Sequence, residues 1–183
     1  MGMTRVSVNR ETRGTREIFA ELYEEFLPRV FRYIRYRVNT EEVTEDLTSV
    51  VFEKALTNFE KYSAEKASFS TWIFSIARNA VIDHYRTQAR RPALSLEKAK
   101  IEVSSNEPLP GDALENMEER EKLRACILKL PVKEQEIVAL KFGSGLNNRQ
   151  IARTTGLSES NVGTRLYRAV RKLRDSFREA ENG

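Results

Sequence analysis

The residues best suited to a chemical task lie near the C-terminus, where a short predicted helix, a glycine turn and a longer predicted helix follow one another. Small and apolar residues recur there at the spacing that lets two helices cross closely: Ile151, Ala152, Leu157, Val162 and Leu166. Gly156 can adopt the positive φ that a sharp turn needs, and Ser158 can cap the longer helix. The pattern predicts a helix-turn-helix, whose second helix places its first residues against base edges in the major groove of DNA.

The longer of these two helices carries an excess of positive charge. Residues 158–178 contain six bases and two acids, a net charge of +4. Basic side chains along one helix suit DNA phosphates, and the polar residues ahead of them suit base edges. The candidates for base contact are Ser160, Asn161, Thr164 and Arg165. The alternative is a helical hairpin with a solvated basic face, but the agreement of turn, cap, core spacing and charge favours DNA binding.

Another predicted helix, over 71–89, combines aromatic and basic residues. Trp72, Phe74 and Tyr85 lie among polar and cationic side chains, and residues 78–91 hold four bases and one acid, a net charge of +3. Aromatic rings beside cations suit single-stranded nucleic acid, because bases stack on the rings and phosphates pair with the cations. The alternative is that the aromatic residues form the core, as their helical spacing usually indicates, and Trp72 is itself expected there.

Negative charge gathers ahead of this aromatic helix. Residues 41–65 contain seven acids and two bases, a net charge of −5. Acidic residues at a helix N-terminus are stabilised by the helix dipole, so a purely local role is one explanation. The other is that the acidic face docks a basic surface of a protein partner.

Helices are needed to position these residues, and the spacing of apolar residues predicts them. Residues 15–36 show the three- and four-residue spacing of an amphipathic helix, with Pro28 predicting a kink or a break within it. Thr40 can cap the acidic helix that follows. Residues 58–69 have no clean period and are predicted to form an ordered loop, after which Ser70 is expected to cap the aromatic helix.

The second half of the chain begins after a change in composition. Residues 93–113 contain serine, proline and glycine with little periodicity, and are predicted to be a flexible linker. Helical periodicity returns at Leu114, and Pro131 fits the start of a helix over 131–142. The helix-turn-helix completes the chain, ending near Ala180. Since no strand pattern stands out, the predicted fold class is all-α, with two small helical domains joined by the linker.

The composition excludes several classes of protein. The longest apolar runs are about four residues, far below the roughly 20 that a membrane-spanning helix needs. One cysteine and one histidine leave little for a disulfide, a metal site or a nucleophile–base pair. The N-terminus lacks a signal-peptide pattern. We therefore expect a cytoplasmic chain that does not insert into membranes and has no metal, no cofactor and no enzymatic activity.

Taken in order, these segments resemble a bacterial sigma factor of the sigma-70 family, in the extracytoplasmic-function group. The resemblance rests on residues 45–52 (EDLTSVVF), 69–79 (FSTWIFSIARN), 82–86 (IDHYR) and 130–131 (LP), and on the helix-turn-helix through 171–174 (RKLR). It covers roughly residues 15–178, nearly the whole chain.

The resemblance implies a region 2 domain over 12–92, the flexible linker over 93–113 and a region 4 domain over 114–180. Its members are transcription initiation factors that bind core RNA polymerase, direct it to specific promoters and help to melt the DNA. The implied partners are core RNA polymerase, promoter DNA and an anti-sigma factor. The acidic helix would bind the clamp of the large catalytic polymerase subunit through Glu45, Asp46 and Ser49.

Two sets of DNA contacts are implied by the same resemblance. In region 2, the pocket for a base extruded from the −10 element would be lined by Lys61, Tyr62 and Ser63, and the strand would be contacted by Arg78, Asn79 and Arg86. Extrusion costs a few kcal/mol, which stacking and a fitted pocket must offset. Region 4 would read the −35 element as duplex DNA through Arg149, Ser160, Asn161, Thr164, Arg165, Arg168 and Lys172.

The sequence departs from the family pattern at two places. Ser49 and Val50 stand where the family commonly has a Gln–Glu pair, and Gly163 stands where a basic residue is common. The details of polymerase contact and the −35 sequence are therefore not inferred.

Three rival functions are set against the family prediction. One is a helix-turn-helix repressor or activator with a sensing domain, against which the aromatic–basic helix argues. The second is a helical adaptor that binds only protein, against which the basic recognition helix argues. The third is an enzyme, for which the sequence offers no nucleophile–base pair and no metal cluster.

Overall fold

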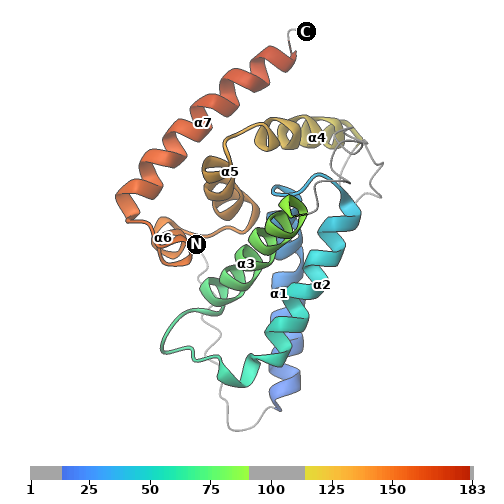
Figure 1. Cartoon of the computed structure of the whole chain (residues 1–183), viewed down its shortest axis with the longest axis vertical. Coiled ribbons are helices and arrows are strands. Elements are labelled where there is room, and N and C mark those ends of the chain that lie inside the picture. Colours follow the sequence, from blue (N-terminus) through green and yellow to red (C-terminus); the bar gives the residue numbers. More distant parts are fainter. Residues whose placement is uncertain (1–13, 91–113, 182–183) are drawn as a thin grey trace.

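The computed structural model describes residues 14–90 and 114–181, and the elements within these ranges are helices (Figure 1). The predicted all-α fold class is confirmed. The linker predicted over 93–113 and the outer limits of the predicted domains at 12 and 92 lie outside the described residues. None of the described helices has both the length and the apolar character needed to cross a membrane.

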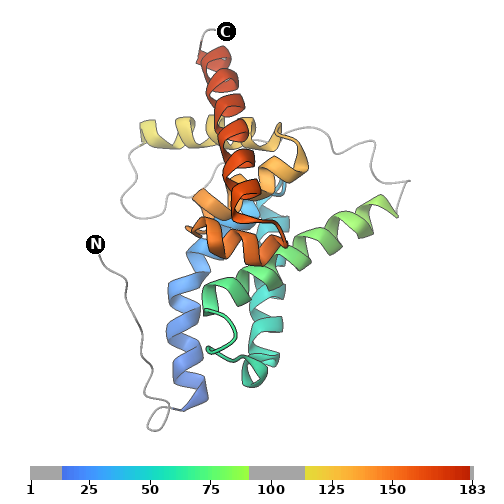
Figure 2. The ribbon, with the colours of Figure 1, turned by 90° about the vertical axis from the view of Figure 1, so that its left-hand side faces the viewer.

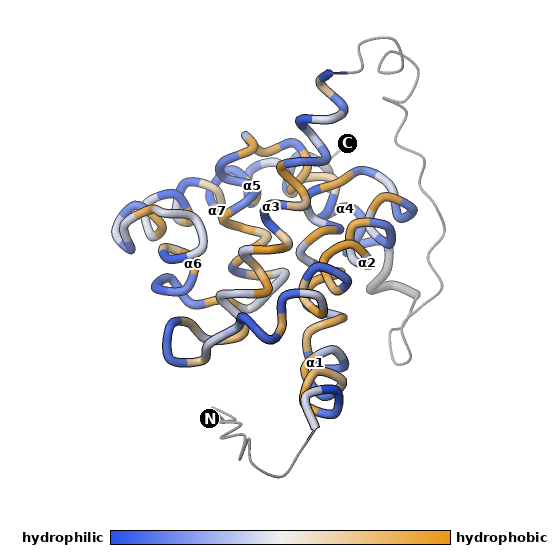
Figure 3. Tube along the Cα trace, turned by 60° about the horizontal axis from the view of Figure 1, so that its bottom comes forward, coloured by the Kyte–Doolittle hydropathy of each residue, from blue (hydrophilic) through white to orange (hydrophobic). Residues whose placement is uncertain are grey.

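The N-terminal half consists of α1 (Thr15–Arg35), α2 (Glu41–Thr57) and α3 (Phe69–Ala89), with the short 3-10 helix η1 (Phe59–Lys61) before α3. Helix α2 packs against both α1 and α3. The apolar faces of these helices meet in a core that includes Phe26, Val30, Ile34, Val51, Ile73, Phe74 and Val81. Figure 3 shows hydrophobic and hydrophilic positions alternating along α1, as the amphipathic spacing predicts.

Pro28 does not break α1, which is one continuous helix. A proline inside a helix costs about 3 kcal/mol, because one backbone hydrogen bond is lost and the ring crowds the preceding turn. Phe26 and Val30 flank the proline and are buried in the core. Burying each such side chain contributes about 1.5–3 kcal/mol, which offsets the cost and keeps the helix intact.

The N-cap of α3 is Ser68, so the prediction of Ser70 as the cap is wrong. The Ser68 Oγ accepts a hydrogen bond from the Thr71 backbone N–H at 3.3 Å, and the helix begins at Phe69. Phe69 and Ser70 are buried in the first turn. Packing of that turn against the core therefore places the helix start two residues earlier than the sequence pattern indicated.

The C-terminal half consists of α4 (Leu114–Leu128), α5 (Val132–Val138), α6 (Asn148–Thr155) and α7 (Glu159–Glu181). The helix predicted over 131–142 is present but changes form, because α5 continues into a π-helical turn, η3 (Ala139–Gly143). The Ser144 N–H accordingly reaches back to the Ala139 carbonyl, at 3.1 Å. Pro131 is the N-cap of α5.

The two halves share one hydrophobic core. Apolar residues of the second half join the buried cluster built on α1 and α3: Ile137, Leu140, Leu146, Ile151 and Val162. Figure 2 shows α5 and α6 against the N-terminal helices. This arrangement agrees with the contacts of η3 with α1 and of α6 with α3. The chain is therefore closed on itself, with the helix-turn-helix packed on the aromatic–basic helix α3.

Candidate nucleic-acid interface

The helix-turn-helix has both of its predicted boundaries. Gly156 ends α6 with a φ of 76°, the left-handed conformation that favours glycine. Ser158 caps α7, because its Oγ accepts from the Asn161 N–H at 3.2 Å. The short helix predicted over 148–155 is present as α6, but its capping box was not predicted. The side chains of Asn147 and Gln150 each accept the other's backbone N–H, at 2.9 and 3.0 Å. The Asn-x-x-Gln spacing of such a capping box is a sequence signal that could have revealed it.

The predicted −35 residues lie on the open side of the helix-turn-helix. Ser160, Asn161, Thr164 and Arg168 are exposed on α7, and Arg165 is half-buried. Two other predicted contacts already have acidic partners: the Arg149 Nε lies 3.2 Å from a Glu159 oxygen, and the Lys172 Nζ lies 2.8 Å from a Glu134 oxygen. Within the described ranges Arg165 and Arg168 have no ion pair, which leaves these two cations available to a ligand.

The predicted residues of the −10 pocket lie in the segment before α3, where the Tyr62 ring packs against other aromatic side chains. The Tyr62 hydroxyl donates to the Ala67 carbonyl at 3.1 Å and so closes the loop. The Tyr62 ring centroid lies 5.0 Å from that of Trp72 and 6.1 Å from that of Phe59. Lys61 is exposed and Ser63 is half-buried, and the two residues flank Tyr62 in the chain. The loop therefore carries a cation and a hydroxyl next in sequence to a packed aromatic ring.

The predicted strand contacts on α3 fall into two groups. Asn79 and Arg86 are exposed, with Arg86 3.7 Å from Asp83 in an exposed ion pair worth little. Arg78 instead turns towards the second half of the chain, where its Nε donates to a Glu136 carboxylate oxygen at 2.9 Å. The closed chain thus leaves part of α3 open to a strand and covers the rest.

The predicted polymerase-binding residues share an outward face of α2. Glu45, Asp46 and Ser49 are all exposed, and Glu42, Glu53 and Leu56 extend the same face at three- and four-residue spacing. Leu56 is 56% exposed, an unusual degree for a large apolar side chain beside acids. Thr40 caps this helix as predicted, by accepting from the Val43 N–H at 3.3 Å. We call this acidic face with its apolar end the α2 stripe (Glu42, Glu45, Asp46, Ser49, Glu53 and Leu56).

Polar contacts between the halves were not anticipated from the sequence. The Arg29 guanidinium donates twice to the Ser144 carbonyl, at 2.9 and 2.7 Å, and lies 4.5 Å from the centroid of the Phe26 ring. Burial lowers the pKa of Arg29 from its ordinary value. The Gln150 side chain donates to the Ser70 hydroxyl at 2.9 Å. These bonds tie α1 and α3 to the segment that carries the helix-turn-helix.

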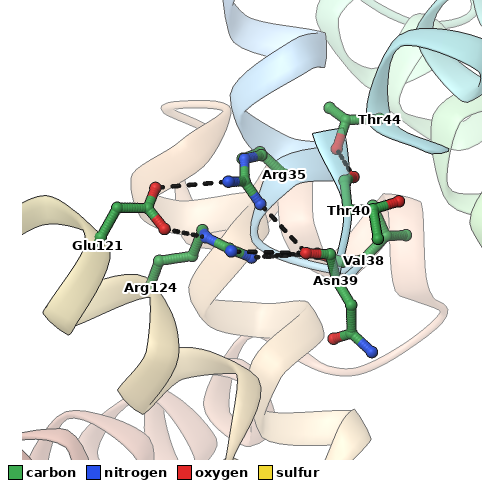
Figure 4. Close-up of polar contacts among 7 residues, drawn as sticks. All are labelled: Arg35, Val38, Asn39, Thr40, Thr44, Glu121 and Arg124. Atoms are coloured by element: carbon green, nitrogen blue, oxygen red, sulfur yellow. Dashed lines mark hydrogen bonds and ion pairs between the residues drawn. The ribbon is translucent and has the colours of Figure 1, made fainter. Parts of the chain in front are cut away.

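A second group of contacts ties α4 to the turn after α1 (Figure 4). Arg124 donates to a Glu121 oxygen at 2.8 Å and to the carbonyls of Val38 and Asn39 at 3.4 Å. Arg35 reaches the other Glu121 oxygen at 3.5 Å. Arg35 thus reaches a carboxylate 86 residues away in sequence, and Arg124 reaches backbone carbonyls 86 and 85 residues away, which no local pattern could reveal.

A capped helix-turn-helix with a basic recognition helix, joined to an aromatic–basic helix, defines a helical DNA-binding protein. Residues 22–91 match the family model described as Sigma-70 region 2, and residues 120–173 match that described as Sigma-70, region 4. The chain belongs to the sigma-70 family of RNA polymerase sigma factors, in its extracytoplasmic-function (ECF) group. Sigma factors direct RNA polymerase to promoters, with regions 2 and 4 binding the −10 and −35 elements.

The chain is similar to several curated sigma factors. It is 32% identical to the ECF RNA polymerase sigma factor BldN of Streptomyces coelicolor over 91% of this chain, and spans 62% of that protein's length. It is 29% identical to the ECF RNA polymerase sigma factor RpoE of Cereibacter sphaeroides over 92% of both chains. Among solved structures, RpoE of Bartonella quintana in complex with the anti-sigma factor NepR shares the fold, with a TM-score of 0.74, 18% identity and coverage of 88% of this chain and 98% of that one.

Proposed function

We propose that this chain binds core RNA polymerase in the cytoplasm, directs it to a subset of promoters and helps to open them, with no catalytic activity of its own. The observation that carries the proposal is the pairing, in one chain, of a basic helix-turn-helix suited to duplex DNA with a second surface suited to a single strand. Phe69 and Phe74 of α3 are buried in the core, so this second surface consists of the half-buried rings of Tyr62 and Trp72 and the exposed Asn79 and Arg86. A repressor needs only the first of these surfaces. A promoter-opening factor needs both, because it meets DNA in both states.

Recognition of the −10 element is assigned in this proposal to the loop before α3 and to the exposed part of α3. A base leaving the duplex would meet Tyr62 with its chain neighbours Lys61 and Ser63, and the adjoining strand would pass Asn79 and Arg86. Stacking on an aromatic side chain is worth about 1–3 kcal/mol per base, comparable with the few kcal/mol that extrusion costs. The loop, fixed by the hydroxyl bond of Tyr62, would supply this surface with little ordering at the moment of binding.

Recognition of the −35 element is assigned to the start of α7. Ser160, Asn161, Thr164 and Arg165 occupy its first two turns, where a recognition helix contacts base edges, and Arg168 follows one turn later. Arg149 and Lys172 would exchange their acidic partners for phosphates on binding. The Arg149–Glu159 pair is exposed on both sides, so its exchange costs little. Glu134 is 16% exposed, so releasing Lys172 costs more.

Core polymerase is assigned to the α2 stripe. Its acids would meet a basic surface, and Leu56 would add apolar area at the end of the contact. An anti-sigma factor is also proposed as a partner, because the structural neighbour RpoE was solved with the anti-sigma factor NepR. A second neighbour, CnrH, was solved with the cytosolic domain of CnrY.

Reversal of one charge on the α2 stripe is expected to disrupt polymerase binding. The variant Asp46→Lys should bind core polymerase at least tenfold more weakly, about 1.4 kcal/mol, because a like-charge contact at an interface is unfavourable. Promoter-specific transcripts made by the host's core polymerase on host DNA should fall accordingly. The matched control is Glu24→Lys, the same charge reversal at an exposed position on α1. Equal transcription by both variants would reject the assignment, and no specific transcript from the unaltered chain would reject the proposed function.

Loss of Arg165 is expected to weaken −35 binding without affecting the fold. Arg165→Ala should lower the affinity of the reconstituted holoenzyme for promoter duplexes by about tenfold, within the 1–3 kcal/mol expected for a base-contacting arginine. Circular dichroism should be unchanged, since Arg165 is only half-buried and forms no ion pair within the described ranges. Arg32→Ala, which removes an exposed cation from α1, should leave affinity within twofold of the unaltered chain. Similar losses in the two variants would indicate a nonspecific charge effect and contradict the assignment.

A further inference from the structure

A buried cluster of charges joins the two halves where α5 meets α3 and the end of α1. Glu136, on α5, lies between Arg78 of α3 and Arg37, which follows α1. The Arg78 Nε is 2.9 Å and the Arg37 Nη1 is 3.4 Å from the same carboxylate oxygen, Glu136 Oε1. The side chain of Arg37 is 3% exposed and that of Glu136 is 13% exposed. One acid from region 4 thus neutralises two cations that both belong to region 2.

Arg37 is held in place by region 2 itself. Its Nη1 donates to the Tyr33 hydroxyl at 3.5 Å. Its backbone carbonyl accepts from the Tyr85 hydroxyl on α3. Burial raises the pKa of Tyr33 to about 12, so the phenol stays protonated and neutral beside the cation. Removal of Glu136 would therefore leave the Arg37 side chain in contact with the Tyr33 hydroxyl and its backbone held by Tyr85.

The two arginines have more capacity for an anion than Glu136 uses. Both contact one oxygen of that carboxylate. The Arg37 Nε is buried and has no hydrogen-bond partner in the part of the chain that the structure describes. A buried guanidinium nitrogen normally has one. A phosphodiester offers two anionic oxygens, which suits two guanidiniums better than a single shared oxygen does.

We propose that Arg37 and Arg78 form a phosphate-binding site of region 2 for the DNA strand, and that Glu136 of region 4 fills this site in the closed chain. The inference rests on the proposed function, because it takes α3 as a strand-binding helix. Asn79 adjoins Arg78 and is exposed, so a strand along α3 reaches the site once α5 has moved away. Arg37 was not among the DNA-binding residues predicted from the sequence.

Competition between DNA and region 4 follows from this arrangement. The strand and Glu136 require the same two cations, so each weakens the binding of the other. The free chain is then a poor DNA binder, although it carries a suitable surface. A partner that separates the two halves would remove Glu136 from Arg37 and Arg78 and so expose the phosphate site.

The test uses the full chain without polymerase and without a promoter. The probe is a fluorescein-labelled, mixed-sequence 20-nucleotide DNA strand, with binding followed by fluorescence anisotropy across a salt series. Glu136→Gln should bind the probe about fivefold more tightly than the unaltered chain. Its plot of log affinity against log salt should be steeper by about 0.7 for each phosphate gained. Glu119→Gln removes the same charge at an exposed position on α4 and should stay within twofold.

The gain must also depend on the arginines. In the double variant Glu136→Gln/Arg78→Gln, affinity and salt dependence should return to those of the unaltered chain. The proposed phosphate site would be rejected if Glu136→Gln increased affinity for the strand no more than Glu119→Gln does. It would also be rejected if the increase persisted without Arg78. If Glu136→Gln fails to fold by circular dichroism, Gly143→Ala provides a second route, since an added Cβ there meets the Tyr33 Cα at 3.1 Å and forces η3 from α1. That variant should also bind the strand more tightly, and only while Arg78 is present.

These outcomes are separate from failure of the proposed function. Promoter-specific transcription by the unaltered chain with core polymerase tests the function, whereas the strand-binding assay contains neither polymerase nor promoter. A chain that initiates specifically but shows no Glu136 effect refutes the phosphate site alone. A chain with the Glu136 effect that never initiates refutes the function alone.

Discussion

Replacing Arg124 with methionine is expected to lower the free energy of unfolding by about 3 kcal/mol, because it breaks a buried ion-pair network. Arg124 is 4% exposed on α4. Methionine fills a similar volume but leaves Glu121 without its nearest cation and the carbonyls of Val38 and Asn39 without these donors (Figure 4). Arg35 remains beside Glu121 but at 3.5 Å, a longer contact than the 2.8 Å of Arg124.

The burial of Arg124 decides the size of this effect. An exposed ion pair contributes at most about 1 kcal/mol, whereas removal of one partner from a buried pair costs about 3–5 kcal/mol. Glu121 is 33% exposed and can recover some hydration, so the lower end of that range is expected. For a chain of this length, about 3 kcal/mol corresponds to a fall in Tm of roughly 6–12 °C.

Thermal and urea unfolding provide the measurement, with Lys122→Met as the matched control. Lys122 is an exposed cation on the same helix, so its replacement should change stability by no more than about 0.5 kcal/mol. Comparable stability of the two variants would show that the contacts between α4 and the end of α1 do not hold the halves together.

Much of the fold could be predicted because each helix carries its own apolar spacing and its own end signals. Thr40, Gly156 and Ser158 are local signals, and each marks a helix end as predicted. Ser68 and Ser70 show where local signals fail. Either serine could cap α3, and the choice depends on the burial of Phe69 against Phe26, whose ring centroids are 5.0 Å apart.

Within the candidate interface, the sequence could predict the positions of exposed residues but not those of buried ones. Asp46 and Arg168 were placed on open faces because polar residues opposite an apolar stripe point outwards, and both are exposed. Arg37 and Arg124 follow the same sequence pattern, yet both are almost completely buried. The Val38 and Asn39 carbonyls that Arg124 contacts lie 86 and 85 residues away. Because a buried arginine depends on such distant partners, neither hydrophobic spacing nor net charge could distinguish these residues from solvated ones.

The same limit explains why the contact between the two helical domains could not be predicted from the sequence. The spacing of Ile151 and Val162 predicted that they pack between the two helices of the helix-turn-helix. In the structure they also join the core built on α1 and α3. Helical spacing indicates that a face is buried, but not which helix covers it. The contact between the halves depends on shape at specific points, and one of these is Gly143, where an added Cβ would lie 3.1 Å from the Tyr33 Cα.

Replacing Gly143 with alanine is expected to lower the free energy of unfolding by about 1–3 kcal/mol, the usual cost of overpacking a filled core. A Cβ at this position would lie 3.1 Å from the Tyr33 Cα and 3.3 Å from the Tyr33 N. Tyr33 lies in the last turn of α1, and its backbone atoms cannot rotate aside as a side chain can. The segment η3 must therefore shift by a few tenths of an ångström, which also strains the neighbouring bonds from Arg29 to the Ser144 carbonyl.

The matched control is the same substitution at Gly163, which should have the opposite sign. Gly163 lies within α7, and the nearest atom to an added Cβ is the Asn148 Nδ2 at 4.0 Å, an ordinary contact. Alanine there should stabilise the chain by about 1 kcal/mol through helix propensity alone. Urea unfolding of both variants should then show midpoints on either side of that of the unaltered chain. Midpoints that move in the same direction would mean that η3 does not press on α1, because both variants add the same methyl group and differ only in what that group meets.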